Sequence, residues 1–303
     1  MEQMFYEKLI RIIPEKRVLR DEVMKKHTTF RVGGPADFFV MPGSREELRD
    51  ITVLCKSEGM PYYIMGNGSN LLVSDRGYRG VIIQIYREMS MITVDENQIT
   101  AGAGALLSKI AGSALEAGLT GFEFAAGIPG TLGGACMMNA GAYGGEMKDV
   151  LKEVTVLTPE GEFTVIPAGE LDMGYRTSVI EKKGYVVLEA VIALEKGEHE
   201  SIRKRMEELR EKRVSKQPLE YPSAGSTFKR PEGYFAGKLI EDAGLRGYRT
   251  GGAQVSEKHC GFVINTGNAE AKDIMELMKQ VSERVMEKSG VLLEPEVRRL
   301  GDF

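Results

Sequence analysis

The uneven distribution of glycine constrains this chain more than any other sequence feature. The 303 residues include 36 glycines, and seven of them fall within residues 127–145. Glycine destabilises helix interiors and central strands, because it loses more backbone freedom on folding than any other residue. We therefore expect residues 127–145 to form a set of tight turns that contains no helix and no central strand.

A second glycine-rich segment, Gly66-Asn67-Gly68-Ser69-Asn70, directly follows a predicted strand at 62–65. Its glycines permit positive φ and a close approach to a ligand, so that successive amides can bind a phosphate. The segment lacks the lysine of a Walker A loop and the third glycine of the dinucleotide fingerprint. Taken alone, it is equally well explained by a simple turn. Because the loops at Gly66 and Gly127 are 61 residues apart, we interpret the pair as a site for one extended anion such as a dinucleotide.

Apolar periodicity and turn residues predict alternating helices and strands. The predicted helices cover residues 4–13, 44–59, 105–117, 198–214, 235–243 and 270–288. The predicted strands cover residues 36–41, 62–65, 71–73, 81–85, 91–94, 98–101, 153–157, 162–166, 185–194, 261–265 and 296–300. This order is typical of mixed layers of helix and sheet. A proline-containing linker over 217–222, which follows a highly charged helix, places a domain boundary near residue 200.

Composition excludes several classes of protein. The 40 basic and 44 acidic residues give a net charge of −4, unlike the basic balance of nucleic-acid-binding proteins. Three separate cysteines, Cys55, Cys136 and Cys260, argue against a disulfide framework, and three scattered histidines argue against a metal centre. The N-terminal segment lacks the apolar core of a signal peptide, and no run of about 18 apolar residues exists. We expect a cytoplasmic protein without a bound metal and without a membrane or nucleic-acid partner.

Three motifs carry candidate chemistry: Arg176 in residues 174–178, Ser226 in residues 223–229 and Glu296 in residues 294–298. Singly, Arg176 is explained by a surface ion pair, Ser226 by a turn and Glu296 by a solvated carboxylate. Together the three side chains suit enolate chemistry. An arginine stabilises a developing anion, a hydroxyl donates a proton, and a carboxyl kept protonated by burial donates a hydrogen bond to the anion. The sequence leaves open whether they converge in space.

Six motifs now stand in a fixed order along the chain. They are Gly66-Asn67-Gly68-Ser69-Asn70-Leu71-Leu72, Gly127-Ile128-Pro129-Gly130-Thr131-Leu132-Gly133-Gly134, Asn139-Ala140-Gly141-Ala142-Tyr143-Gly144, Tyr175-Arg176-Thr177-Ser178, Gly225-Ser226-Thr227-Phe228-Lys229 and Pro295-Glu296-Val297-Arg298. Together they resemble the motifs of the UDP-N-acetylenolpyruvoylglucosamine reductase family. The resemblance runs from His27 to Gly301, nearly the whole chain.

The resemblance implies an α+β fold of the FAD-binding vanillyl-alcohol-oxidase type. Two FAD-binding subdomains would cover residues 1–85 and 86–200, with a strand at 292–303 returning to the first, and a separate α+β substrate-binding domain would cover residues 201–291. FAD would be bound non-covalently by residues of the first three motifs. These residues are Gly66, Asn67, Gly68, Ser69, Asn70, Leu71, Gly127, Ile128, Pro129, Gly130, Thr131, Gly133, Gly134, Asn139, Gly141, Ala142 and Tyr143.

The resemblance also implies a reaction in two steps. NADPH would reduce the FAD and leave, and UDP-N-acetylglucosamine enolpyruvate would take its place, so that one pocket serves two substrates in turn. A hydride would pass from flavin N5 to the enolpyruvyl methylene carbon. Arg176 and Glu296 would stabilise the resulting enolate, and Ser226 would protonate it to give UDP-N-acetylmuramate for peptidoglycan synthesis. We expect a monomer whose partners are these small molecules.

The positions that resemble substrate-binding residues of the family are Tyr175, Lys216, Lys229 and Gln254. Lys216 is equally explained as one more charge at the basic end of a helix, and His259 is open between a structural and a functional role. The family has two forms, one of which carries an inserted segment with a tyrosine that covers the substrate. Only 50 residues separate Arg176 from Ser226, and a strand and the charged helix fill them. We therefore assign the form without the insertion.

Two other functions fit the same residues. A different FAD-dependent oxidase or dehydrogenase of this fold, acting on a sugar or lactone, often tethers FAD through a His or Cys, and Cys136 lies in a glycine-rich segment. A non-catalytic protein that binds a flavin or a nucleotide sugar would use the same loops, and Arg176, Ser226 and Glu296 would then be incidental. Replacing Ser226 with alanine separates these functions from the reductase.

Overall fold

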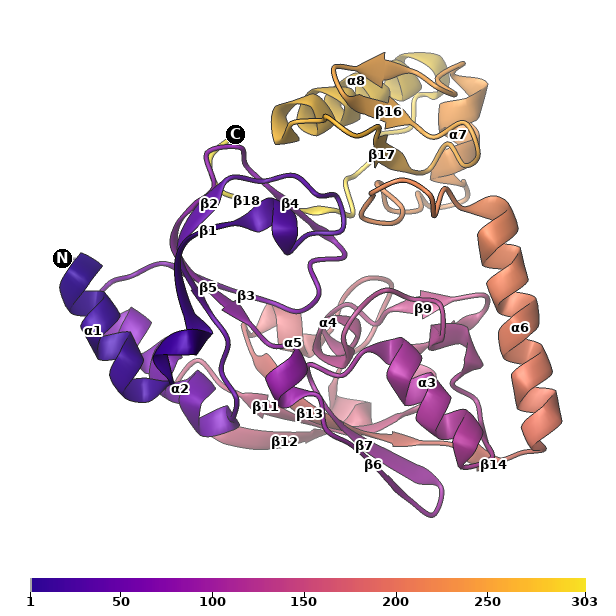
Figure 1. The fold of residues 1–303 in the computed structure, drawn as a ribbon. Helices are drawn as coiled ribbons and strands as arrows, with labels where there is room; N and C mark the ends of the chain where they lie inside the picture. The colour runs from indigo at the N-terminus through magenta and orange to yellow at the C-terminus, as the bar shows by residue number, and fades with distance from the viewer. Residues whose placement is uncertain (1) are drawn as a thin grey trace. The chain divides into compact units, whose positions relative to one another are not determined.

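The computed structural model describes residues 2–303 and consists of two units (Figure 1). Unit 1 contains the N-terminal residues up to Leu19 together with Phe38–Asn67 and Gly80–Lys212. Unit 2 contains Arg20–Asp37, Gly68–Arg79 and Arg213–Phe303. The C-terminal residues therefore fold together with two short segments from the first 80 residues of the chain.

The N-terminal part of the chain combines two helices with a four-stranded sheet. Helices α1 (Glu2–Ile12) and α2 (Arg45–Ser57) contact each other, and the strand order is β1 (Val18–Val23), β2 (Pro35–Val40), β5 (Tyr78–Gln84) and β3 (Tyr62–Met65). The division between the units falls within β1, β2 and β5. Ser44 caps α2 by accepting a hydrogen bond from the amide of Glu47 at 3.1 Å. The predicted helices at 4–13 and 44–59 and the strands at 36–41, 62–65 and 81–85 are confirmed.

The larger sheet of unit 1 is antiparallel. Its order is β12 (Phe163–Pro167), β11 (Leu151–Leu157), β13 (Val186–Ala193), β7 (Gln98–Gly102) and β6 (Ile92–Asp95). Helix α3 (Leu107–Glu116) contacts β6 and β7, and α4 (Leu132–Met137) contacts β13 and α5 (Val179–Lys182). The pairing of β11 with β12 confirms the hairpin predicted from Pro159-Glu160-Gly161.

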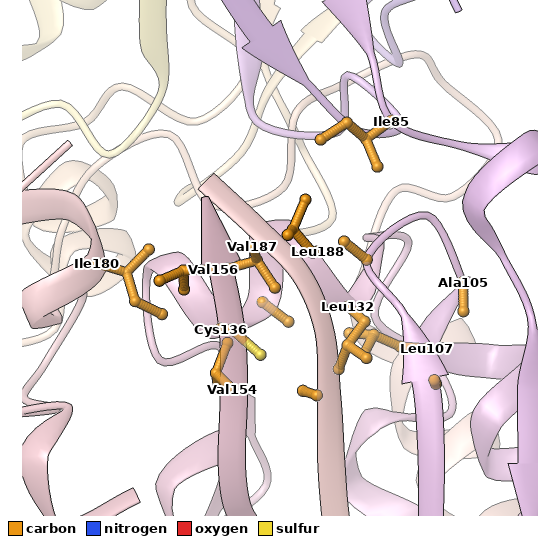
Figure 2. Packing of buried hydrophobic residues seen from close by; sticks show 14 of the residues in the cluster. Ile85, Ala105, Leu107, Leu132, Cys136, Val154, Val156, Ile180, Val187 and Leu188 are labelled. Carbon is orange, nitrogen blue, oxygen red and sulfur yellow. The ribbon is translucent and has the colours of Figure 1, made fainter. Parts of the chain in front are cut away.

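One hydrophobic core includes this sheet and the helices α3 and α4 that contact it (Figure 2). Figure 2 shows Leu132 and Cys136 of α4 in the same core as Val154 and Val156 of β11 and Leu188 of β13. Full burial of a side chain of this size stabilises the fold by about 1.5–3 kcal/mol. Packing of its apolar side, more than intrinsic propensity, therefore accounts for the short helix α4.

The expectation that residues 127–145 contain no helix is wrong, since α4 lies within them and includes Gly133 and Gly134. A Cβ at Gly133 would lie only 3.0 Å from the Cβ of Ala103 and 3.2 Å from its carbonyl oxygen, so close packing requires glycine there. The amides of Leu132 and Gly133 donate to the carbonyls of Ala105 and Ala103, each at 2.8 Å. These tertiary contacts outweigh the cost of glycine in a helix, about 1 kcal/mol per residue.

Unit 2 is built around helix α8 (Ala271–Ser289), which contacts α7 (Ala236–Asp242) and a three-stranded antiparallel sheet. The sheet order is β15 (Arg249–Thr250), β16 (Ala253–Val255) and β17 (Val263–Asn265). The predicted apolar stripe of α8 is buried and consists of Ile274, Leu277, Met278, Val281 and Val285. Gly290 ends the helix in the left-handed conformation with φ of 70°.

The C-terminus of the chain returns to a segment that follows the first glycine loop. Strand β18 (Arg298–Leu300) pairs in parallel with β4 (Leu71–Val73), with Arg298 opposite Leu71. After β4, the carboxylate of Asp75 accepts hydrogen bonds from the first two amides of α8, those of Ala271 at 2.7 Å and Lys272 at 2.9 Å. The start of α8 is therefore tied to the β4 segment within unit 2.

The remaining elements are short, apart from the charged helix α6 (His199–Lys216), whose buried residues are Ile202 and Leu209. The sequence did not indicate β1, α5, β15, β16 or the two-residue strands β8 (Leu119–Thr120), β9 (Gly141–Ala142), β10 (Gly145–Glu146) and β14 (Glu195–Lys196). Over residues 2–303, no helix is both long and apolar enough to cross a membrane. The same residues contain no cluster of three or more His, Cys, Asp or Glu side chains suited to a metal ion.

Candidate active site

The two glycine loops touch each other within unit 1. The side-chain amide of Asn67 donates to the carbonyl of Pro129 at 2.8 Å, and a Cβ at Gly66 would come within 3.0 Å of the Thr131 Oγ1. Gln84 of β5 donates its side-chain amide to the Gly66 carbonyl at 3.3 Å and so holds the first loop. The structure thus brings together the two loops that the sequence pattern paired.

The second loop has an open face of small residues. Gly127, Pro129 and Gly134 are exposed, while the carbonyl of Gly130 accepts a hydrogen bond from the amide of Leu107 at 3.1 Å. A Cβ at Gly134 would have its nearest neighbour 3.8 Å away, so a ligand can approach the backbone there. A fixed backbone with small exposed residues fits an extended dinucleotide such as FAD, because successive amides can bind its pyrophosphate.

The third glycine motif forms the tight hairpin of β9 and β10. Its central residues, Tyr143 and Gly144, have φ of 53° and 93°, as a type I′ turn requires. A Cβ at Gly145 would lie 2.7 Å from the Phe124 ring, and one at Gly141 would lie 2.6 Å from the Gly145 carbonyl. Packing therefore requires these two glycines, whereas Tyr143 at the tip is 41% exposed and is accessible to a ligand.

Asn139 has a buried side chain whose hydrogen bonds lie inside unit 1. Its Nδ2 donates to Oε2 of Glu146 at 2.6 Å and to the carbonyl of Gly174 at 3.2 Å, and its Oδ1 accepts from the amide of Lys148 at 2.9 Å. The sequence places Asn139 among the cofactor-binding residues. Because both N–H groups of the carboxamide already have acceptors in the protein, contact with a cofactor would fall mainly to the backbone.

Arg176 lies in a two-residue turn between Gly174 and Thr177, in unit 1. The amide of Gly174 donates to the Thr177 carbonyl at 3.1 Å, and the amide of Thr177 donates back at 3.4 Å. Arg176 has φ of 55°, in the left-handed region, and its guanidinium carbon lies 5.1 Å from the centre of the Tyr175 ring. The Tyr175 side chain is 53% exposed. The turn therefore presents an arginine and an aromatic ring side by side.

Ser226 and Glu296 lie on neighbouring segments of unit 2. The amide of Glu296 donates to the carbonyl of Thr227 at 2.8 Å, and the amide of Lys229 donates to the carbonyl of Glu294 at 2.8 Å. This antiparallel register places Glu296 opposite Thr227, next to Ser226. The buried Thr227 fixes its segment, because its Oγ1 accepts a hydrogen bond from the amide of Val263 at 2.8 Å. Ser226 is exposed and Glu296 is partly buried.

Asn70, at the end of the first glycine loop, holds the Glu296 segment within unit 2. Its Nδ2 donates to the backbone carbonyl of Glu296 at 3.1 Å, and its own carbonyl accepts from the amide of Arg298 at 3.0 Å. The loop is further fixed by Gly68, whose carbonyl accepts from the amide of Thr29 at 3.2 Å. A residue expected to contact the cofactor thus also positions the candidate carboxyl.

The residues predicted to bind the substrate differ in their surroundings. Lys229 forms an ion pair with Glu294 at 3.2 Å, and Lys216 is exposed at the end of α6. Gln254 is buried, and its Nε2 donates to the Gly247 carbonyl at 3.3 Å and lies 3.4 Å from a Glu257 carboxylate oxygen. Of the two lysines, Lys216 is exposed and Lys229 is paired with a carboxylate, whereas Gln254 is engaged in holding its own loop.

His259 lies in a half-buried position and is held by a backbone contact. Its Nδ1 accepts a hydrogen bond from the amide of Gly261 at 3.1 Å, so the proton of the neutral ring lies on Nε2. Burial lowers the pKa of His259, and the charges of Arg246 and Lys216 lower it further. The ring also makes an edge contact with Phe262, with centroids 5.0 Å apart.

Cys136 offers no attachment point for a flavin. It is fully buried in α4 among apolar side chains (Figure 2), and burial raises the pKa of its thiol from 9.0 to about 12. The thiolate is the nucleophile of cysteine chemistry, and at neutral pH the thiolate of Cys136 is essentially absent. This observation argues against the tethered-flavin alternative.

Three supporting side chains were not singled out from the sequence. They are Gln84, Glu146 and Ser178, whose hydroxyl donates to the carbonyl of Met137 at 2.6 Å. Gln84 carried a signal, because it is a polar residue that ends β5 directly after the apolar run Val81-Ile82-Ile83. Ser178 stood inside a quoted motif, but nothing in the sequence indicates which carbonyl it meets.

Comparisons with known proteins give consistent matches over the whole chain. A family model described as an FAD binding domain matches residues 36–166, and one described as the C-terminal domain of UDP-N-acetylenolpyruvoylglucosamine reductase matches residues 217–300. A protein of Agathobacter rectalis named UDP-N-acetylenolpyruvoylglucosamine reductase is 54% identical over 315 residues, which cover 100% of both chains.

Solved structures agree with this match. The crystal structure of UDP-N-acetylenolpyruvylglucosamine reductase from Thermus caldophilus is 40% identical, covers 94% of this chain and 99% of its own, and has a TM-score of 0.81. A variant of Phl p 4, described as a glucose oxidase, is 14% identical, covers 64% of this chain and 44% of its own, and has a TM-score of 0.51. The second likeness concerns the fold alone, and together they confirm the FAD-binding fold expected from the sequence.

Proposed function

The chain belongs to the UDP-N-acetylenolpyruvoylglucosamine reductase family, and on this premise we propose the roles of its site residues. Its activity is the FAD-dependent reduction of UDP-N-acetylglucosamine enolpyruvate in peptidoglycan precursor synthesis. Arg176 and Glu296 stabilise the enolate of the enolpyruvyl group, and Ser226 protonates it. The product is UDP-N-acetylmuramate.

The chemistry divides between the cofactor and the side chains. FAD, held by the glycine-rich loops, would supply the hydride chemistry between NADPH and the enolpyruvyl methylene carbon. The guanidinium of Arg176 stabilises the negative charge that then develops on the substrate carboxylate and the adjacent carbon. Glu296, in its protonated form, donates a hydrogen bond to the same anion. The Ser226 hydroxyl gives its proton to the carbon next to the carboxylate.

The observation that carries this proposal is the register between the Ser226 and Glu296 segments. The hydrogen bond from the Glu296 amide to the Thr227 carbonyl, at 2.8 Å, sets a carboxyl and a hydroxyl on adjacent extended segments of one unit. The buried Thr227 and the side chain of Asn70 keep both segments in place. Such fixed neighbours are what a proton donor and an anion stabiliser need, because small displacements cost rate.

The glycine-rich loops hold the cofactor. Gly66 and Asn67 of the first loop, in contact with the second loop over 127–134, would hold the pyrophosphate through backbone amides, and the exposed Tyr143 would help to hold the cofactor. Lys216 and Lys229 attract the phosphates of the sugar nucleotide, and Tyr175 packs against it beside Arg176. Gln254 shapes the pocket through its contact with the Gly247 carbonyl. His259 is left without a catalytic role.

Membership of this family also underlies a proposal for the domain organisation of the chain. FAD binding falls to residues 1–85 and 86–200 and substrate binding to residues 201–291, with the strand at 292–303 returning to the first part. The FAD-binding match ends at residue 166 and the C-terminal match begins at residue 217, which supports a boundary near residue 200. The enzyme works as a cytoplasmic monomer, and light scattering of the purified protein at micromolar concentration tests the monomer.

An anaerobic titration of the purified flavoprotein tests the function. NADPH should bleach the flavin absorbance, and UDP-N-acetylglucosamine enolpyruvate should then restore it. A flavin that bleaches but is not reoxidised by this substrate contradicts the reductase and favours an oxidase or dehydrogenase with another acceptor. A protein that takes up no FAD contradicts the interpretation of the glycine loops.

The role of Ser226 is tested in the second step alone. Ser226→Ala should slow reoxidation by the enolpyruvyl substrate by about 10²-fold or more and leave reduction by NADPH unchanged. Ser223→Ala, in the same loop, is the matched control and should keep both rates. Equal reoxidation rates in the two variants would rule out Ser226 as the proton donor and would favour a non-catalytic binding role for the segment.

A further inference from the structure

The turn that carries Arg176 is fixed at both ends by buried side chains. At one end, the carbonyl of Gly174 accepts a hydrogen bond from Nδ2 of Asn139 at 3.2 Å. At the other, the hydroxyl of Ser178 donates to the carbonyl of Met137 at 2.6 Å. Both partners belong to residues 137–139, which form the C-terminal end of α4 and the two residues after it. The position of Arg176 relative to that loop is therefore set by two side chains within unit 1.

Arg176 depends on this anchoring because its backbone is unfavourable on its own. Its φ of 55° lies in the left-handed region, which residues other than glycine seldom adopt. Backbones of this kind persist only where the surrounding structure holds them in place. Asn139 is itself left-handed, with φ of 45°, and only 1% exposed. One left-handed residue thus donates to the carbonyl of Gly174, two positions before the other, which indicates a specific requirement at this place.

We propose that Asn139 is a positioning residue for Arg176 and acts through the carbonyl of Gly174. Glu146 orients the carboxamide of Asn139, because its Oε2 accepts one of the N–H groups at 2.6 Å. The other N–H is thereby directed at the Gly174 carbonyl. Glu146 is in turn fixed by a reciprocal capping contact with Asp149. The inference rests on the proposed role of Arg176, and it gives Asn139 a task other than contact with the cofactor.

The test needs variants that remove the hydrogen bond without straining the backbone. Asn139→Gly deletes the carboxamide while keeping the left-handed conformation accessible. Asn139→Asp keeps the shape and the tolerance for positive φ, but it replaces the donor with an oxygen that faces the Glu146 carboxylate. Asn97→Ala is the matched control, because Asn97 also donates to a backbone carbonyl of unit 1, that of Leu194 at 3.2 Å.

In the holoenzyme, both Asn139 variants should slow reoxidation of the reduced flavin by the enolpyruvyl substrate by about tenfold to 10²-fold. We expect kcat to fall with little change in KM, and flavin content and reduction by NADPH to stay near those of the parent protein. Amide hydrogen exchange of residues 171–179 should become faster in the same variants, since the Gly174 carbonyl is released. Asn97→Ala should change none of these quantities.

A double-mutant cycle with Arg176 shows whether Asn139 acts by positioning Arg176 or has an effect of its own. In an Arg176→Ala background, Asn139→Gly should cost less than about twofold, because its target is gone. An undiminished loss in that background, or variants of Asn139 that lose FAD instead of rate, would overturn the positioning role. If Arg176→Ala leaves turnover unchanged, the proposed role of Arg176 is itself contradicted, whatever the Asn139 variants show. Glu146→Ala, at a partly exposed position, repeats the cycle if Asn139→Gly does not fold.

Discussion

The side-chain amide of Asn70 donates a hydrogen bond to the backbone carbonyl of Glu296 at 3.1 Å, across 226 residues of sequence. Asn70, the last residue of the first glycine loop, and the segment of the candidate carboxyl are thereby joined within unit 2. The parallel pairing of Leu71 with Arg298 continues the same contact along the chain. A loop predicted to bind a cofactor is thus also part of the support for Glu296, which we propose as an acid that acts on the substrate.

Asn70→Ala should therefore affect catalysis as well as FAD affinity. Loss of one hydrogen bond of this kind lowers the free energy of unfolding by about 1 kcal/mol, which urea denaturation measures. We expect reoxidation by the enolpyruvyl substrate to slow by about tenfold even when FAD is saturating. Full recovery of the rate at saturating FAD would show that Asn70 serves the cofactor only.

Gly66→Ala should separate the two glycine loops. Its Cβ would come within 3.0 Å of the Thr131 Oγ1, and no positive φ adds strain at this position. We expect the Kd for FAD, measured by fluorescence quenching, to rise by at least about tenfold, which corresponds to 1.4 kcal/mol. Gly112→Ala is the control, because a Cβ there meets nothing within 4 Å.

A compensating change makes the Gly66 prediction specific. Thr131→Ala removes the hydroxyl and methyl groups that the new Cβ of Gly66→Ala would meet, so the double variant should bind FAD more tightly than Gly66→Ala alone. An equal or weaker affinity in the double variant would mean that the clash with Thr131 is not the cause of the loss.

Stability should fall at alkaline pH through two buried thiols. Burial raises the pKa of Cys55 and of Cys136 from 9.0 to about 12. Because the folded state holds these protons more tightly than the unfolded state, the free energy of unfolding decreases as pH rises from 9 toward 12. Each group contributes about 1.4 kcal/mol per pH unit in that range.

The variant with Cys55→Ala and Cys136→Ala should show a flatter pH dependence than the parent protein in urea denaturation between pH 8 and 10. Identical slopes would contradict the raised pKa values.

The burial of the Cys136 thiol also predicts that the flavin is not covalently bound. Acid precipitation of the holoenzyme should therefore release all of its flavin into the supernatant. Yellow colour retained in the precipitate would indicate a covalent bond.

Asp75 should stabilise unit 2 through the start of α8. Its carboxylate accepts from the amides of Ala271 and Lys272, and a negative charge at a helix N-terminus is favourable. Asp75→Ala should lower the free energy of unfolding by about 1–2 kcal/mol, with FAD affinity of the folded protein unchanged. Asp50→Ala, which removes an exposed ion pair with the neighbouring Arg49, should cost less than about 0.5 kcal/mol.

Much of the fold could be predicted from local sequence patterns. The stripe of α8, the cap at Ser44 and the hairpin between β11 and β12 were all predictable, because helix periodicity, capping and turn chemistry involve residues only a few positions apart. Helix α4 could not be predicted, because it contains Gly133 and Gly134 and glycine destabilises the interior of a helix. Gly133 is tolerated there only because Ala103, 30 residues earlier, leaves no room for a side chain.

The candidate site follows the same division. The order of the glycine loops and the candidate residues Arg176, Ser226 and Glu296 could be predicted from sequence, because each motif is a run of neighbouring residues. The contact of Gly66 with the second loop, the hydrogen bond of Asn70 to Glu296 and that of Asn139 to the Arg176 turn are known only from the folded chain. Those contacts join distant residues, and hydrogen-bond geometry depends on packing that no local pattern specifies.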